Sequence, residues 1–142
     1  MNHSKLIQLL TYLGAVPFFL ALYLSVSDQT FLGVVGVQWF LTYGLVILSF
    51  MAGTLWGQVV NDSLRVKSIA LATNAITLAA WFSFLLAEPS IVLSIIALGF
   101  IALYALEALV MNHLKRPSYY QGMRLRVTVL VAIAHAVMFW QL

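Results

Sequence analysis

Four side chains that could carry charge-pairing, acid–base or hydrogen-bonding chemistry lie inside long apolar runs of the sequence. They are Asn74, Glu107, Arg124 and His135. Polar side chains are costly inside a membrane, so each of them is a candidate functional residue. Glu107 and Arg124 could form an ion pair, whereas His135 could carry a proton or bind a ligand. We treat the four residues as one candidate polar cluster.

Each candidate also has a structural interpretation. Glu107 could be a structural partner of Arg124 or Arg126. His135 could be hydrogen bonded between helices, and Asn74 could hold neighbouring helices together. Helical spacing puts His135 on the same face as Arg124, and the rise per residue puts all of the candidates in the cytoplasmic half of the bilayer. We therefore expect Glu107 to pair with Arg124, with Asn74 and His135 packed around the same site.

The elements that must position these residues are transmembrane helices. The chain has 142 residues, of which 63% are hydrophobic and 8% charged, whereas about a quarter of the residues in soluble domains are charged. A helix needs about 20 apolar residues to cross the hydrocarbon layer. Such runs occur at about residues 6–25, 38–60, 68–87, 91–111 and 124–142. The sequence therefore predicts an all-α integral membrane bundle of five transmembrane helices, with residues 1–142 forming a single membrane domain.

The first run has an alternative interpretation as a secretory signal peptide that ends near Ser27. The run is longer than the roughly 7–15 apolar residues typical of signal peptides, so we expect a membrane span. Pro17 removes one backbone hydrogen bond from this span and should bend it.

The basic residues indicate the orientation of the chain. With five spans they all fall on one side: Lys5, Arg65, Lys67, Lys115, Arg116, Arg124 and Arg126. The loops on the other side hold only Asp28 and Glu88. Positively charged loops stay in the cytoplasm, so we expect a cytoplasmic N-terminus and a C-terminus outside. The expected location is the cell inner (plasma) membrane, as a multi-pass protein.

The second span carries small residues at four-residue spacing. Ser49, Gly53 and Gly57 form a stripe that includes one Gly-x-x-x-Gly, and Trp56 shares a face with Gly53. Helices in lipid associate through close packing and interhelical hydrogen bonds. We expect the stripe to make a tight contact inside the monomer; the alternative is a homo-oligomer face. Together with Pro17, these are the residues expected to determine helix packing.

Several kinds of site are not expected. The chain has no cysteine, which excludes disulfides, thiolate metal sites and cysteine nucleophiles. One histidine within the spans cannot supply two axial haem ligands, although His113 could ligate a group near the membrane surface. The spacings of a zinc site and the motifs of phosphate and dinucleotide sites are missing. We therefore expect no cofactor, no metal, no catalytic residue and no enzyme, and we attribute the formal charge of +3 to orientation rather than to nucleic-acid binding.

Three segments resemble a known family in the expected order. They are Tyr12–Phe18, with Gly-x-x-Pro-Phe; Tyr43–Gly57, in the second span; and Tyr120–Thr128, before the last span. These segments resemble the domain of unknown function numbered 3429, a family of small multi-span membrane proteins with a mitochondrial transmembrane relative. The family usually has histidine before the Trp-Gly pair, where this chain has Leu55, so chemistry that needs that histidine is not expected. The family has no assigned activity, and the resemblance implies architecture only.

Two classes of function remain. The first is an interaction role, as an assembly factor or accessory subunit of a larger membrane complex, which fits the short loops and the small-residue stripe. The second is a small oligomeric transporter or channel whose polar cluster lines a cytoplasm-facing cavity. Polar residues are confined to one half of the spans, which favours the first class. The expected partners are the lipid bilayer and a membrane protein or a second copy of the chain, with no nucleic acid.

Overall fold

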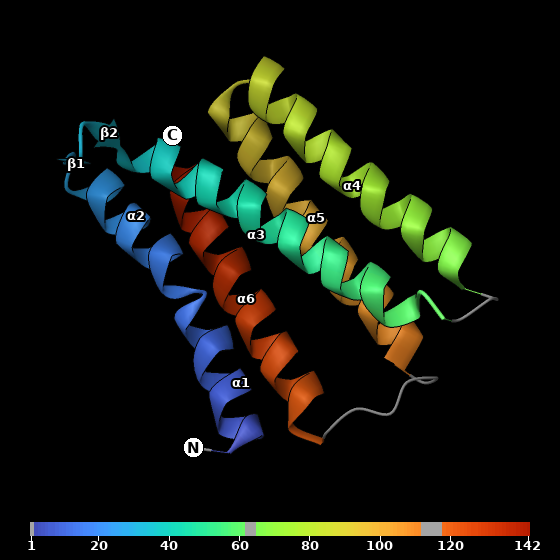
Figure 1. The fold of residues 1–142 in the computed structure, drawn as a ribbon. Coiled ribbons are helices and arrows are strands. Elements are labelled where there is room, and N and C mark those ends of the chain that lie inside the picture. Colours follow the sequence, from blue (N-terminus) through green and yellow to red (C-terminus); the bar gives the residue numbers. More distant parts are fainter. Residues whose placement is uncertain (1, 62–64, 112–117) are drawn as a thin grey trace.

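The computed structural model describes residues 2–61, 65–111 and 118–142. Its elements in chain order (Figure 1) are α1 (His3–Leu13), α2 (Val16–Val26), β1 (Thr30–Phe31), β2 (Val34–Val35), α3 (Gly36–Val59), α4 (Val66–Leu86), α5 (Pro89–Met111) and α6 (Ser118–Gln141). The described part contains five helical units long and apolar enough to cross a membrane, and α1 and α2 together form the first. The predicted all-helical, five-span architecture is therefore confirmed.

The first span is two helices rather than one bent helix. α1 ends at Leu13, and α2 begins at Val16 with Pro17 in its first turn. Proline has no N–H to donate to the preceding turn but is tolerated at the start of a helix, so the expected bend becomes a break. The hydroxyl of Tyr43 on α3 donates to the carbonyl oxygen of Gly14 at 2.6 Å, which satisfies a backbone group at the break.

A short antiparallel hairpin, not expected from the sequence, connects α2 to α3. Phe31 of β1 lies opposite Val34 of β2. The turn residues Leu32 and Gly33 both have positive φ angles, 52° and 78°, as tight hairpin turns require. Trp39 Nε1 donates to the carbonyl oxygen of Phe31 at 3.0 Å, which fixes the hairpin against the first turn of α3.

The last span begins earlier than predicted, at Ser118 rather than at Arg124. The predicted span of residues 124–142 left residues 118–123 outside the helix. A membrane helix can extend into the interface, where amphipathic side chains such as Tyr119 and Tyr120 are favourable. This longer helix changes the depth assigned to every residue that follows.

The helices pack around α3, which contacts α2, α4 and α5, while α6 packs against α5 and α2. Fully buried core side chains include Phe40, Leu48 and Ile96. Two glycines permit the closest approaches: an added Cβ would lie 2.5 Å from the backbone nitrogen of Ser25 at Gly36 and 3.1 Å from the side chain of Leu48 at Gly99. The tight helix contacts of this fold therefore depend on Gly36 and Gly99.

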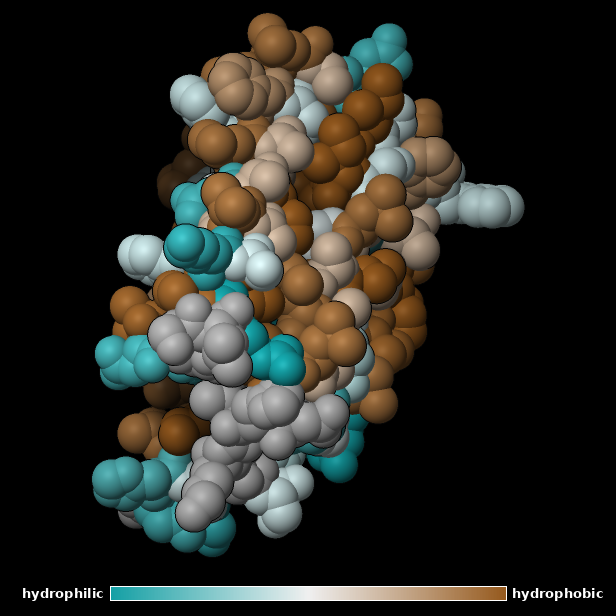
Figure 2. All heavy atoms as spheres, turned by 90° about the vertical axis from the view of Figure 1, so that its right-hand side faces the viewer, coloured by the Kyte–Doolittle hydropathy of each residue, from teal (hydrophilic) through white to brown (hydrophobic). Residues whose placement is uncertain are grey.

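The outer surface of the bundle is strongly apolar. Leu71 on α4 is 73% exposed and Leu86 at its end is 83% exposed. Figure 2 shows hydrophobic residues over most of one face of the molecule, with many of the hydrophilic ones in its lower half. Such continuous apolar exposure is unusual for a soluble monomer and, with the five long helices, identifies a multi-pass membrane protein.

Candidate functional site

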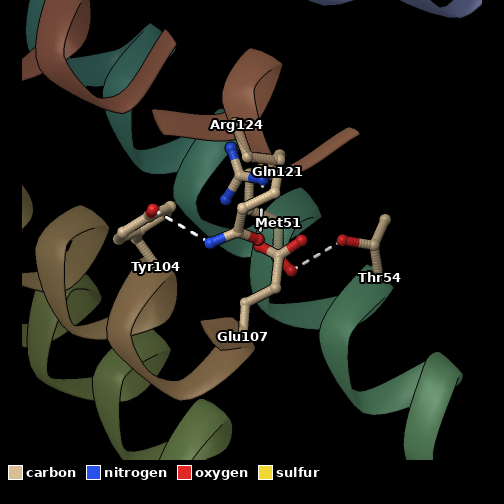
Figure 3. A network of polar contacts seen from close by, with 6 residues as sticks. All are labelled: Met51, Thr54, Tyr104, Glu107, Gln121 and Arg124. Atoms are coloured by element: carbon tan, nitrogen blue, oxygen red, sulfur yellow. Dashed lines mark hydrogen bonds and ion pairs between the residues drawn. The ribbon is translucent and has the colours of Figure 1, made fainter. Parts of the chain in front are cut away.

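Helices α5 and α6 bring Glu107 and Arg124 together. Arg124 Nε donates to Glu107 Oε2 at 2.9 Å, and the two residues are only 6% and 5% exposed. The helical rise puts Glu107 about 6 Å from the end of α5 and Arg124 about 9 Å from the start of α6. The expected contact between these residues is thus present in the interior of the bundle, toward the end where α5 finishes and α6 begins (Figure 3).

A second polar contact lies one helical turn from the ion pair. Gln121 Nε2 donates to the hydroxyl oxygen of Tyr104 at 3.0 Å. Tyr104 precedes Glu107 by three residues on α5, and Gln121 precedes Arg124 by the same spacing on α6, so each pair shares a helix face. Sequence reasoning missed this contact, although the matched spacing of polar residues on consecutive helices was a usable signal.

Arg124 also lines a cavity of about 400 Å³. In Figure 1, α1 and the end of α3 diverge, with α6 between them, and residues of these three helices form most of the cavity wall. Thr54 and Gln58 of α3 lie on the wall together with Arg124, whereas Phe18 and Phe100 contribute apolar surface. α1 has no buried residue, so one side of this cavity is formed by a helix that packs only loosely on the bundle.

His135 is not part of the Glu107–Arg124 site. It lies three turns along α6 from Arg124, about 16 Å by the helical rise. Because α6 begins at Ser118, His135 is about 25 Å from the start of the helix and about 9 Å from its end. The prediction that His135 shares a site, and one half of the bilayer, with Arg124 is therefore wrong, although both belong to the buried face of α6.

The imidazole of His135 is enclosed by aromatic rings. Its ring centroid lies 4.7 Å from that of Phe40, 5.3 Å from Phe18 and 5.7 Å from Phe100. Its Nδ1 lies 2.8 Å from the carbonyl oxygen of Val131, so in the neutral ring Nδ1 carries the proton. Nε2 is buried without a hydrogen-bond partner in the described part of the chain. His135 is thus a core residue with one unsatisfied nitrogen.

Asn74 lies on the opposite side of the bundle core from Arg124, on α4. Its side-chain Nδ2 donates to the carbonyl oxygen of Ala70 at 2.7 Å, and the residue is exposed. Asn74 lines a hollow of about 150 Å³ with Ser49, Gly53 and Trp56 of α3. The prediction that Asn74 packs around Glu107 is wrong, because α4 presents Asn74 to the outside rather than to α5 and α6.

The small-residue stripe of α3 does not make the expected tight contact inside the monomer. Among the described residues, no atom beyond the neighbouring backbone of α3 and the two adjacent residues lies within 4 Å of a Cβ added at Gly53 or Gly57, and both residues are exposed. α3 buries a different face, which includes Gly44, Leu48 and Ala52. The small residues instead leave the surface of α3 open beside α4.

A family model described as "Protein of unknown function (DUF3429)" matches residues 3–140. The chain belongs to this family. The match extends over every helix from α1 to α6, and it confirms the resemblance carried by the three sequence segments. No curated protein and no solved structure matches the chain. Leu55, which precedes the Trp56–Gly57 pair, is 2% exposed in the core, so the side chain at that position points into the bundle.

Three residues considered in the sequence, His113, Lys115 and Arg116, lie outside the described residues. Within the described ranges, no group of three or more histidine, cysteine or acidic residues could hold a metal ion. The described residues of this DUF3429 protein offer charge pairing at Glu107–Arg124 and an exposed amide at Asn74.

Proposed function

We propose that the protein is an accessory or assembly subunit of a larger complex in the cell inner membrane. In this proposal a transmembrane helix of a partner protein binds in the hollow between α3 and α4. One observation carries the proposal: small and polar residues form an exposed surface, lined by Gly53 and Asn74, on helices that otherwise present apolar side chains.

Asn74 is the polar contribution to this surface. It lies about 12 Å from the start of α4, a helix about 31 Å long, and so at the depth of the hydrocarbon layer. Its amide nitrogen is hydrogen bonded to Ala70, but its carbonyl oxygen has no partner among the described residues. Polar groups facing lipid are costly, and a hydroxyl or amide on a neighbouring helix would satisfy this oxygen.

The α3 wall of the hollow suits the close approach of a helix. Gly53 and Ser49 leave the backbone accessible, since nothing within the bundle lies within 4 Å of a Cβ added at Gly53. Trp56 is 44% exposed at the same hollow and offers a large apolar surface to an occupant. Small residues that permit backbone approach, flanked by hydrogen-bonding groups, are typical of helix interfaces in membranes.

We infer a helix of a different protein rather than a second copy of this chain. A two-fold contact brings the same residues of both copies to one axis. In such a dimer Gly53 of one copy would face Gly53 of the other, and the exposed indole of Trp56 from each copy would stand beside this contact. A single foreign helix lying between α3 and α4 meets one Trp56 indole rather than two.

The orientation and location are part of the same proposal. The one-sided basic residues support a cytoplasmic N-terminus and an inner-membrane location. The cavity beside α1 does not support the transport alternative, because Phe18, Phe100 and Val131 line it away from Arg124. We therefore do not propose a transporter.

The test uses the absence of cysteine from the chain. Single cysteines at Trp56→Cys and Asn74→Cys, both at the hollow, carry a photoactivatable crosslinker, with Ala136→Cys on the exposed side of α6 as the matched control. After illumination of native membranes, positions 56 and 74 should yield the same adduct, with the crosslinked peptide in a transmembrane segment of a second protein. Position 136 should not yield it.

Two results would overturn the proposal. An adduct of twice the mass of the chain from positions 56 and 74 would assign the hollow to a homodimer. Adducts to lipid alone at both positions would show that the surface faces the bilayer.

A further inference from the structure

The cavity between α1, α3 and α6 contains a buried charged group beside an apolar space. We infer that this cavity binds a single-chain amphiphile with an anionic head, a carboxylate or a phosphate monoester, and that Arg124 contacts the head. The cavity is separate from the hollow between α3 and α4, so this inference does not rest on the proposed docking of a partner helix.

The opening between α1 and α3 is part of the fold. α1 packs against α2 and α6, and the break after Leu13 allows it to leave the direction of α2. The Tyr43 hydroxyl holds the carbonyl of Gly14 at 2.6 Å, which fixes the position of the break against α3. The side chain of Leu10, 59% exposed, lines the space that results.

Arg124 provides hydrogen-bond donors for the head group. A guanidinium has five N–H donors, and Arg124 uses Nε for Glu107. Nη1 and Nη2 make no hydrogen bond to a described residue and are not among the fully buried atoms without a partner. They are therefore accessible to a ligand in the cavity that Arg124 lines. Carboxylate and phosphate oxygens are the strongest acceptors for a guanidinium.

The surrounding charge favours an anion over a neutral head. Lys5 in the first turns of α1 and Arg126 on α6 add positive charge at the same end of the bundle as Arg124. Arg126 Nη1 donates to the hydroxyl oxygen of Tyr12 at 3.1 Å, which also joins α6 to α1. Among the described residues, Glu107 is the acidic side chain near Arg124. A net positive field of this kind concentrates anionic ligands.

The apolar part of the cavity suits one hydrocarbon chain. From Arg124 to Val131 the cavity follows α6 for about 10 Å, past Phe18, Phe100 and Ile47. Its volume of about 400 Å³ is near the lower end of the roughly 300–1,000 Å³ range of ligand pockets. A space of this size and length matches one hydrocarbon chain, so we infer a single-chain amphiphile.

The test measures binding of a dansyl-labelled fatty acid to the full chain in nanodiscs of phosphatidylcholine. The probe should become brighter on entering the cavity and should be displaced by dodecanoate and by dodecyl phosphate. Dodecanol, which lacks the charge, should compete at least about tenfold more weakly, the fold-change expected for one charged hydrogen bond. Stronger competition by one of the two anions would support the inference and identify the head group.

A neighbouring pair of leucines supplies the variant and its control. Leu10→Trp should fill the cavity and weaken probe binding by about tenfold or more. Leu9→Trp should leave binding unchanged, because Leu9 is exposed on α1 but does not line the cavity. The double variant Glu107→Gln with Arg124→Gln leaves no lone buried charge and should remove the preference for dodecanoate over dodecanol.

The inference is wrong if the wild-type protein does not bind the probe, if dodecanol competes as well as the anions, or if Leu10→Trp and Leu9→Trp bind alike. Leu10→Trp should not change crosslinking from position 56, so failure of this inference and failure of the proposed docking are distinguishable.

Discussion

The ion pair between Glu107 and Arg124 gives the sharpest prediction about stability. Glu107→Gln removes the carboxylate and leaves the guanidinium of a residue that is 6% exposed without its charged partner. Breaking one side of a buried pair costs about 3–5 kcal/mol. Because the glutamine oxygen can still accept from Nε and Arg124 borders a cavity, we expect the lower end of that range, about 3 kcal/mol.

Two companion variants separate the charge effect from simple loss of packing. Glu107→Gln combined with Arg124→Gln removes both charges and should recover stability to within about 1 kcal/mol of wild type. The exchange Glu107→Arg with Arg124→Glu should recover it in part. The free energy of unfolding can be followed by titration with a denaturing detergent. If Glu107→Gln alone is as stable as wild type, the pair does not stabilise the fold. If the folded Glu107→Gln variant then loses a cellular phenotype, the Glu107–Arg124 pair has a functional role.

Further predictions concern helix packing, the buried histidine and the orientation. Gly99→Leu should abolish folding, because a Cβ added at Gly99 already lies 3.1 Å from the side chain of Leu48. Gly53→Leu should fold normally, because a Cβ added there has no such neighbour. The melting temperatures of the two variants in detergent test this difference. His135→Phe should be as stable as wild type or more stable, since it removes the unsatisfied Nε2 at the loss of one backbone hydrogen bond, and a large fall in the melting temperature would contradict this. A reporter fused after Leu142 should show activity outside the cytoplasm; cytoplasmic activity would contradict the five-span orientation.

The sequence was sufficient for the architecture because long apolar runs have few structural solutions in a membrane. It also predicted the Glu107–Arg124 contact, since two opposite charges near adjoining helix ends strongly favour pairing. The start of α6 at Ser118 was missed, because tyrosines and glutamine near a membrane surface are typical of both loops and helix ends.

The rotation of each helix about its axis could not be read from the sequence. α3 is apolar on all sides, so its composition does not distinguish the face that meets other helices from the face that meets lipid. The small residues Gly53 and Gly57 suggested a contact, but α3 buries Gly44 and Ala52 instead. The same missing information led to the wrong placement of Asn74 beside Glu107.

The central claim is that the surface of α3 and α4 binds a partner helix, and one comparison tests it most directly. Gly53→Leu and the control Ala136→Leu are purified in mild detergent, and the amount of the protein crosslinked from position 56 that co-purifies with each is measured. Gly53→Leu should keep the melting temperature of wild type and lose the partner, whereas Ala136→Leu should keep both. A folded Gly53→Leu variant that retains the partner at the wild-type amount would contradict the account.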